Sequence, residues 1–228
     1  MFKRVKSGVV AVSLGLAGVM VIPAQTATAA GTCSMYVPSR VSISQPYRGI
    51  VVPLGPNCKA SSVIWANWDG YHPTQGIQEI MLFDHVSSVV WDLYDWQPIG
   101  RWQWRPAGAH DSGYNEVYQY GPYYTDVRLA SYGRVTATRY GSKVSVTTAA
   151  ARYWQSGSKF IGWSGARGQI QWRAPGTTTW RGLKEVYSNS GGNYSYTYTT
   201  SAVRDYRVVL YDATANTIWG STSPVVRR

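Results

Sequence analysis

Several residue types on which most enzymes depend are scarce in this chain. Its 228 residues include two cysteines, three histidines and three glutamates. His72, His85 and His110 do not show a metal-ligand spacing such as His-x-x-x-His. A Gly-x-Ser-x-Gly nucleophile motif and a glycine-rich phosphate loop are both missing, and a glycosidase carboxylate pair would have to recruit aspartates. We therefore predict no catalytic residue, no metal site and no cofactor.

The first 30 residues have the organisation of a secretory signal peptide. Residues 3–6 carry basic side chains, Gly8–Ile22 is almost wholly apolar, and Ala27–Ala29 supplies the small residues that a signal peptidase requires. The apolar run is shorter than the roughly 20 residues of a membrane span. We predict cleavage near Ala29 or Ala30 and release of a secreted, extracellular protein without a transmembrane segment.

Cys33 and Cys58 are the only cysteines. In an exported chain two cysteines predict a disulfide, because the oxidising compartment favours it. A closed loop of about 26 residues would stabilise the fold by roughly 3.5 kcal/mol through its effect on the unfolded chain. The alternative, a reactive or metal-binding thiol pair, has no neighbouring histidine to support it.

Short β-branched and aromatic runs separated by turn residues fill the mature chain. Lys143–Trp154 and Asn193–Thr199 alternate between two side-chain types, the pattern of half-buried antiparallel strands. About 200 mature residues suit two small β-domains. We predict an all-β chain of two immunoglobulin-like antiparallel β-sandwiches in tandem, at 31–131 and 132–228, after the signal peptide at 1–30.

Three local predictions concern the first of these sandwiches. Ile77–Phe83 fits one helical turn or a buried strand, and its β-rich surroundings favour the strand. Asp69–Gly70 is a turn signal that should end the strand before it. Val89–Tyr94 and Arg101–Arg105, separated by a turn, should form one hairpin in which aromatic residues, among them four of the 11 tryptophans, are concentrated.

Aromatic residues with a polar handle are abundant, with 11 tryptophans and 18 tyrosines against three phenylalanines. Sugar-binding sandwiches stack pyranose rings on exposed tryptophan and tyrosine beside carboxylates. The hairpin could provide such a platform, although strand alternation should turn about half of its rings into the core. The ligand-binding candidates are Trp91, Asp92, Asp95, Trp96, Trp102 and Trp104.

Positive charge is concentrated in the second half of the chain. Residues 31–130 carry six Lys or Arg against eight Asp or Glu, and residues 131–228 carry 13 against three. A basic surface attracts polyanions such as teichoic acids, anionic lipids, nucleic acids or acidic glycans; the alternative is a solvated surface that keeps the protein soluble. The candidates for polyanion binding are Arg152, Arg167, Arg173, Arg181, Arg204 and Arg207.

Three stretches of the second half resemble the bacterial immunoglobulin-like domains of actinomycete secreted proteins. They are Gly168–Val186 (Gly-x-Ile-x-x-Arg-x-x-Gly-x-x-x-Trp-x-x-Leu-x-x-Val), Gly192–Tyr196 (Gly-x-Tyr-x-Tyr) and Arg204–Val208. The resemblance covers about 134–228 and extends loosely to the first half through Gly100–Trp102. It implies a sandwich fold used for spacing, adhesion or carbohydrate contact, and it implies no catalytic residue.

Together these features predict a secreted, non-enzymatic binding module that is extracellular or associated with the cell envelope. Its partner would be an envelope polyanion or glycan, without specific nucleic-acid recognition. One alternative is a carbohydrate-binding sandwich that uses the aromatics of the first domain. Another is a secreted hydrolase or a hydrolase inhibitor.

Overall fold

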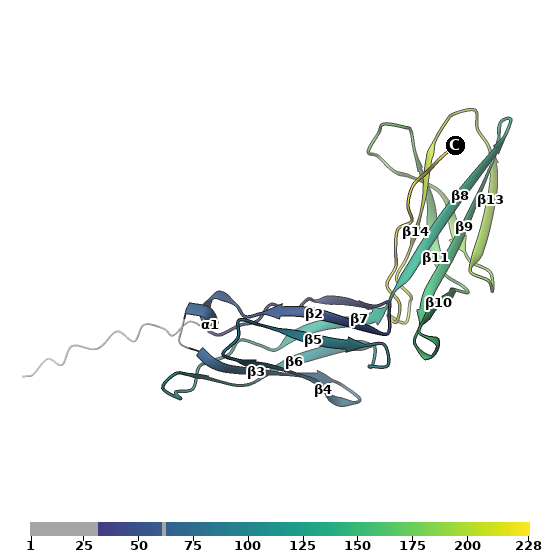
Figure 1. Cartoon of the computed structure of the whole chain (residues 1–228). Helices are drawn as coiled ribbons and strands as arrows, with labels where there is room; N and C mark the ends of the chain where they lie inside the picture. Colours follow the sequence, from purple (N-terminus) through teal and green to yellow (C-terminus); the bar gives the residue numbers. More distant parts are fainter. Residues whose placement is uncertain (1–31, 61–62) are drawn as a thin grey trace, which may run out of the picture. The chain divides into compact units, whose positions relative to one another are not determined.

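The computed structural model describes residues 32–60 and 63–228 (Figure 1). The predicted signal peptide lies outside these residues. Gly31–Arg228 forms one compact unit, so the predicted boundary between two domains at 131/132 remains a prediction. Strands are the predominant regular structure of the described residues, which otherwise contain only the short helices α1 (Pro56–Ala60) and η1 (Gln155–Gly157), and the all-β prediction is confirmed. We call β1–β7 the N-terminal sandwich and β8–β15 the C-terminal sandwich.

The N-terminal sandwich has a five-stranded sheet in the order β1-β7-β6-β3-β4 and a two-stranded sheet β2-β5. The second strand thus pairs with the fifth, and the sixth lies between the third and the seventh, as in immunoglobulin-like sandwiches. One departure from an antiparallel fold is that β1 and β7 run parallel. The strands are β1 (Arg40–Ile43), β2 (Tyr47–Pro53), β3 (Val63–His72), β4 (Gly76–Asp84), β5 (Ser88–Tyr94), β6 (Gly100–Asp111) and β7 (Tyr123–Leu129).

The C-terminal sandwich repeats this plan. In one sheet β9 pairs with β8, β10 and β13, and the other sheet has the order β12-β11-β14-β15. Val144, Val146 and Thr148 on β9 are buried on one face, as the alternation predicts. The strands are β8 (Ser131–Tyr140), β9 (Lys143–Trp154), β10 (Lys159–Gly162), β11 (Arg167–Arg173), β12 (Arg181–Tyr187), β13 (Asn193–Thr199), β14 (Asp205–Leu210) and β15 (Val226–Arg227).

The predicted tryptophan hairpin is wrong. β5 pairs with β2, whereas β6 pairs with β3 and β7, so the two strands belong to opposite sheets. Their inward side chains therefore meet across the core: the Trp91 ring centroid lies 5.0 Å from that of Trp104 and 5.4 Å from that of Trp102. Trp68 and Phe83 meet edge to face in the same core.

The structure also places Asp69–Gly70 inside β3 rather than at its end, and the chain turns at residues 73–75 instead. A register shift lies between Gly70 and Tyr71. A Cβ atom at Gly70 would stand 2.6 Å from the Trp104 ring. Glycine is therefore needed here for close packing against an aromatic ring, and not for a turn. The ambiguous Ile77–Phe83 segment is a strand, as predicted, within β4.

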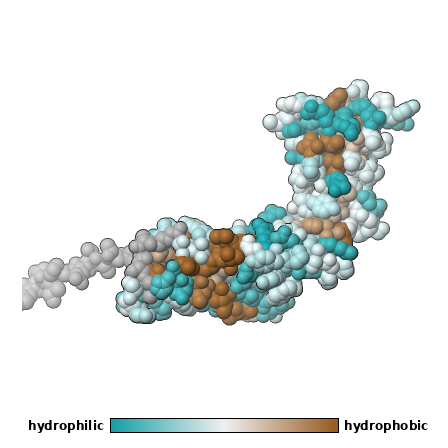
Figure 2. Space-filling view, in the orientation of Figure 1, coloured by the Kyte–Doolittle hydropathy of each residue, from teal (hydrophilic) through white to brown (hydrophobic). Residues whose placement is uncertain are grey.

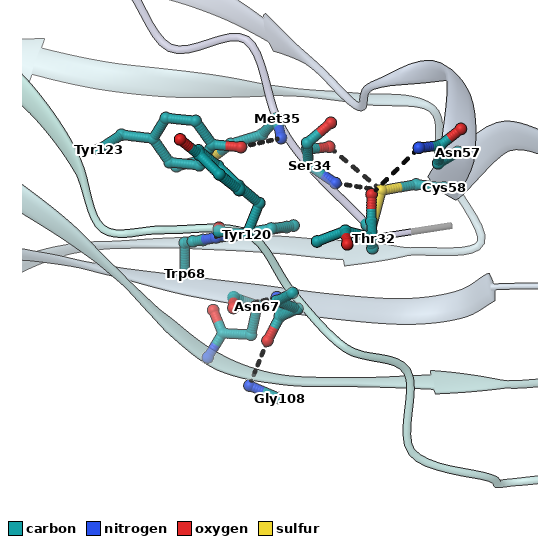
Figure 3. Close-up of a disulfide and its surroundings, with 12 residues drawn as sticks. Thr32, Ser34, Met35, Asn57, Cys58, Asn67, Trp68, Gly108, Tyr120 and Tyr123 are labelled. Atoms are coloured by element: carbon teal, nitrogen blue, oxygen red, sulfur yellow. Dashed lines mark hydrogen bonds between the residues drawn. A yellow bond between two sulfur atoms is a disulfide. The ribbon is translucent and has the colours of Figure 1, made fainter. Parts of the chain in front are cut away.

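The predicted disulfide between Cys33 and Cys58 is present and joins the first described residues to α1 (Pro56–Ala60) (Figure 3). Cys33 also lies alongside Tyr118–Tyr120, because its N–H donates to the Tyr118 carbonyl and its carbonyl accepts from Tyr120. The Trp68 indole N–H donates to the Tyr120 carbonyl at 3.1 Å. The disulfide thus connects α1 to a segment that is itself attached to the core.

Removing the disulfide should destabilise the protein without changing its fold. We expect Cys33→Ser/Cys58→Ser to lower the free energy of unfolding by about 3.5 kcal/mol, because a loop of this length is no longer closed in the unfolded chain. Urea unfolding of the oxidised wild type and of the double variant measures the difference. An unchanged midpoint would show that the backbone hydrogen bonds of Cys33 hold this edge without the covalent link.

In the described part of the chain, no helix has the length and apolarity needed to cross a membrane.

Candidate functional site

Four of the six predicted arginines gather around two tryptophans of the C-terminal sandwich. The guanidinium carbons of Arg204 and Arg181 lie 3.7 and 5.6 Å from the Trp172 ring centroid. Those of Arg207 and Arg173 lie 4.1 and 4.6 Å from the Trp180 ring centroid. We call this group the arginine cluster; its members are Arg173, Arg181, Arg204, Arg207, Trp172 and Trp180.

The members of the cluster come from the end of β11 and from residues near the starts of β12 and β14. Side-chain alternation along β11 places Trp172 and Arg173 on opposite faces. Gln171 and Arg207 are partners across β11 and β14, and Trp172 lies opposite Arg181 on β12. Between β11 and β12 the chain turns at Gly176, whose φ of 79° is the left-handed conformation that glycine favours. This turn returns the chain so that Trp180 lies against two arginines of the neighbouring strands.

Asp205 is the carboxylate that pairs with the cluster. Its Oδ2 lies 3.3 Å from Arg173 Nε, and its Oδ1 lies 2.7 Å from Nε of Arg227. Hydrogen bonding from Arg227 is the main cause that holds the Asp205 pKa below its usual value, and Arg173 adds to the effect. Asp205 is shared between Arg173 and Arg227. Among the described residues, Arg181, Arg204 and Arg207 therefore have no carboxylate in an ion pair with them.

Arg207 and Arg204 donate hydrogen bonds to neutral groups, Arg204 through Nη1 to the Tyr198 hydroxyl at 3.4 Å. Arg207 Nε donates to the Gln171 side-chain oxygen at 2.8 Å. Burial lowers the Arg207 pKa, and the positive charge of Arg173 nearby lowers it further. Arg204 Nε is buried without a hydrogen-bond partner among the described residues. An anion bound here would relieve this excess of positive charge.

A pocket of about 320 Å³ opens beside these residues. When the flat face of a guanidinium group stacks on an aromatic ring, the N–H groups at its edge remain free to bind a phosphate or carboxylate. Trp172 thus holds Arg181 in place at the pocket wall. The lining residues are Trp172, Arg173, Ala174, Thr177, Thr179 and Arg181.

The ion pairs of Asp205 should make stability depend on pH. The folded-state pKa of Asp205 is lowered, so its contribution is complete above its ordinary pKa of about 3.9 and is lost as the pH falls through the folded-state value. We expect Asp205→Asn to destabilise the protein at pH 6 and to have a smaller effect at pH 3. Urea unfolding of both proteins at both pH values measures this, and an equal difference at the two would contradict it.

The other two predicted arginines lie elsewhere. Arg167 lies over the Tyr187 ring, 5.5 Å from its centroid. Arg152 donates to the Tyr153 carbonyl at 3.4 Å. Within the described residues, neither makes a recorded contact with the arginine cluster, so the structure divides the predicted set into a cluster of four and two separate residues.

The predicted aromatic platform does not form from the residues proposed for it. Trp91, Trp102 and Trp104 are each 0 % exposed, since they fill the space between the two sheets. The Trp104 indole N–H donates to Thr125 Oγ1 at 3.0 Å. These rings cannot stack on a sugar at the surface. Asp92 and Trp96 are exposed.

Asp95 is buried and has a structural role. The Tyr153 hydroxyl donates to its Oδ2 at 2.8 Å, and the Ser158 hydroxyl donates to the same oxygen at 2.6 Å. Burial, and then the bond to Asp95, raise the Tyr153 pKa. Asp95 therefore connects the end of β5 to β9 and to the turn that follows it, and its carboxylate is already occupied.

The three histidines lie apart. His72 is buried against the Ile99 carbonyl and Thr74, and His85 pairs with the neighbouring Asp84. His110 stacks on Trp65. Across residues 32–60 and 63–228, no three His, Cys, Asp or Glu side chains are grouped so that they could hold a metal ion.

The sequence analysis missed Trp172 and Trp180 as members of the site. Each tryptophan directly precedes one of the predicted arginines, Arg173 or Arg181. This Trp-Arg pair does not mark the site, because each tryptophan lies against arginines other than the one that follows it, and the same pair occurs at Trp104–Arg105, where the tryptophan is buried in the core.

No protein-family model and no curated protein matches the chain. Among solved structures, it is similar to the BSP domain of a biofilm-associated protein, with 7% identity over 86% of this chain and 28% of that one and a TM-score of 0.28. The chicken CNTN1 FN1–FN3 domains give 10% identity over 85% and 65% of the two chains, with a TM-score of 0.32. A DUF3823 family protein from Bacteroides uniformis gives 8% identity over 86% and 98%, with a TM-score of 0.28. The chain spans less than two thirds of the first two structures, and similarity this low adds nothing to the argument from the site.

Proposed function

We propose that this protein is a secreted, non-enzymatic module that binds an anionic polymer of the cell envelope through the arginine cluster. The observation that carries the proposal is that Arg173, Arg181, Arg204 and Arg207 lie over Trp172 and Trp180. Arg173 and Arg181 also line a pocket, and among the described residues Asp205 pairs with only one of the four, Arg173. An excess of fixed positive charge in one place attracts a chain of repeated negative groups.

Pre-organisation supports binding over a merely solvated surface. Free arginine side chains lose rotamer entropy when they bind an anion. In the arginine cluster, stacking on Trp172 and Trp180 and the bond from Arg207 to Gln171 restrict the side chains before any ligand arrives. Less entropy is then lost on binding, so each contact contributes more to affinity.

The predicted signal peptide supports a location outside the cell, and the resemblance to actinomycete secreted domains supports a bacterial envelope as the place of action. Phosphodiester polymers and acidic glycans are the anions that such an envelope offers to an exported protein. The shared chemistry is a flexible chain of phosphate or carboxylate groups, which matches the forked geometry of guanidinium.

Co-sedimentation of the purified secreted protein with cell walls tests the proposal. We expect the protein to pellet with intact walls at low salt and to stay in the supernatant after the phosphodiester polymers have been removed from them. Loss of pelleting only after removal of the carboxylate polymers would assign an acidic glycan instead. A protein that stays in the supernatant with intact walls at low salt would refute envelope binding.

A further inference from the structure

The outer face of the small β2-β5 sheet carries an exposed aromatic surface. Tyr47 and Tyr94 are direct partners across the two strands, and their ring centroids are 5.2 Å apart. Trp96 follows β5 and stacks on Tyr94 with a centroid distance of 5.5 Å and an interplanar angle of 18°. Trp96 is nevertheless 70 % exposed, so its ring remains largely open to solvent.

A carboxylate lies within this surface. Asp92 is on the same face of β5 as Tyr94, and the Tyr47 hydroxyl donates to its Oδ1 at 2.7 Å. Gly49, the partner of Asp92 across the sheet, leaves the space for this bond, because a Cβ there would lie 3.2 Å from the Tyr47 hydroxyl. The ring and the carboxylate are thus positioned by each other.

Glu79 is a second acidic group, but it lies on β4 of the five-stranded sheet and shares a side of that strand with the buried Met81 and Phe83. Burial, and to a smaller extent the Asp92 charge, raise the Glu79 pKa. Among the described residues, neither carboxylate has an ion pair with an arginine or lysine. Ionised carboxylates are acceptors only, so this surface offers acceptors for a ligand that is rich in hydroxyl donors.

The surface continues along the strands. Val51 and Val90 are partners two residues beyond Gly49 and Asp92, and both are exposed. From Tyr94 to Val90 the strand advances about 13 Å, at roughly 3.3 Å per residue. Figure 2 shows hydrophobic surface on the N-terminal sandwich in the region where β2 and β5 lie. The surface is long enough for an oligosaccharide.

We propose that Tyr47, Tyr94, Trp96 and Asp92 form a glycan-binding site on the N-terminal sandwich, separate from the arginine cluster. The apolar C–H face of a pyranose ring stacks on Trp96, and the ring hydroxyls donate to Asp92. A flat apolar protein partner fits less well, because it would bury Asp92 without a matching donor. A polyanion fits less well because both nearby charges are negative.

Screening the secreted protein on an array of neutral oligosaccharides, followed by calorimetry on the glycans that bind, tests this site. We expect Trp96→Ala to weaken binding at least about tenfold, the size of one lost aromatic stack. Asp92→Asn should weaken binding several-fold, while the amide oxygen of the new side chain can still accept the hydrogen bond that the Tyr47 hydroxyl donates. Trp154→Ala is the matched control, because Trp154 is a 39 % exposed tryptophan on the C-terminal sandwich, and it should bind as the wild type does.

Two results would overturn the glycan site: a folded protein that binds no glycan on the array, or full affinity in Trp96→Ala. Equal melting temperatures of Trp96→Ala and the wild type show that loss of binding is not unfolding. The Arg181→Ala/Arg207→Ala variant should bind the glycan as the wild type does and should no longer bind the polyanions of the cell wall. Failure of the glycan site can therefore be distinguished from failure of the proposed function.

Discussion

Trp104→Ala should lower the free energy of unfolding by about 4 kcal/mol, because truncating a large buried ring removes its transfer free energy and leaves a cavity. The ring contacts Trp91 and Trp102 in the core, and its N–H donates to Thr125. Gly70 packs against the same ring and cannot fill the space. A loss of this size is a large fraction of the stability of an ordinary domain.

Trp96→Ala provides the comparison, since it makes the same chemical change on an exposed ring. We expect it to alter the free energy of unfolding by less than about 0.5 kcal/mol, as most surface substitutions do. Urea unfolding followed by circular dichroism measures both variants. Equal effects for Trp96 and Trp104 would mean that the buried and exposed tryptophans have been assigned wrongly.

Arg181→Ala/Arg207→Ala should weaken binding to intact cell walls at low salt at least about a hundredfold, because each substitution removes a charge-assisted contact of about 1.5–3 kcal/mol and every 1.4 kcal/mol is about tenfold. These two arginines are the choice because neither makes an ion pair with Asp205, whereas Arg173 does. The variant should therefore keep its fold. Co-sedimentation over a range of wall concentrations gives the affinities.

Arg134→Ala/Lys143→Ala is the control for this variant. It removes the same net charge from the same sandwich, at exposed positions on β8 and β9. At an ionic strength of about 0.15 M, where attraction between exposed charges more than about 8 Å apart is largely screened, we expect its affinity for walls to stay within about threefold of the wild type. Equal loss in the two double variants would mean that net charge, and not the arginine cluster, determines binding.

Strand positions could largely be predicted from the sequence, because burial on one face imposes a period of two. Lys143–Trp154 forms a strand with the predicted bounds, and the strand after Trp180 begins at Arg181 with a register shift opposite it. Two further segments pair more weakly: Val117–Tyr120 makes only isolated bridges, and Ile218–Val226 makes bridges and the short β15.

Pairing between strands could not be predicted in the same way. The alternation in Val89–Tyr94 and Arg101–Arg105 shows that each strand has an inner face, but it does not show which sheet the strand joins. The rings of Trp91, Trp102 and Trp104 therefore looked like neighbours on a surface, whereas they meet across the core. Gly70 was misinterpreted because glycine serves both turns and close packing, and only the position of Trp104 distinguishes the two.

The site was partly predictable for a similar reason. Charge counting identified the basic half of the chain and all four arginines of the cluster. It could not separate them from Arg152 and Arg167, because the grouping depends on the register of β11, β12 and β14. On the outer face of the β2-β5 sheet, Asp92 and Trp96 were predicted as ligand-binding residues. Tyr47 and Tyr94 could be added only once the pairing of β2 with β5 was known.

The salt dependence of binding to a linear polyphosphate tests the central claim most directly. If all four arginines of the cluster contact phosphate, the logarithm of the binding constant should fall against the logarithm of salt concentration with a slope of about −2.8, at roughly 0.7 per contact for a single-stranded polyanion. In Arg181→Ala/Arg207→Ala the slope should be about −1.4. A wild-type slope near zero, or the same slope in both proteins, would contradict polyanion binding by the arginine cluster.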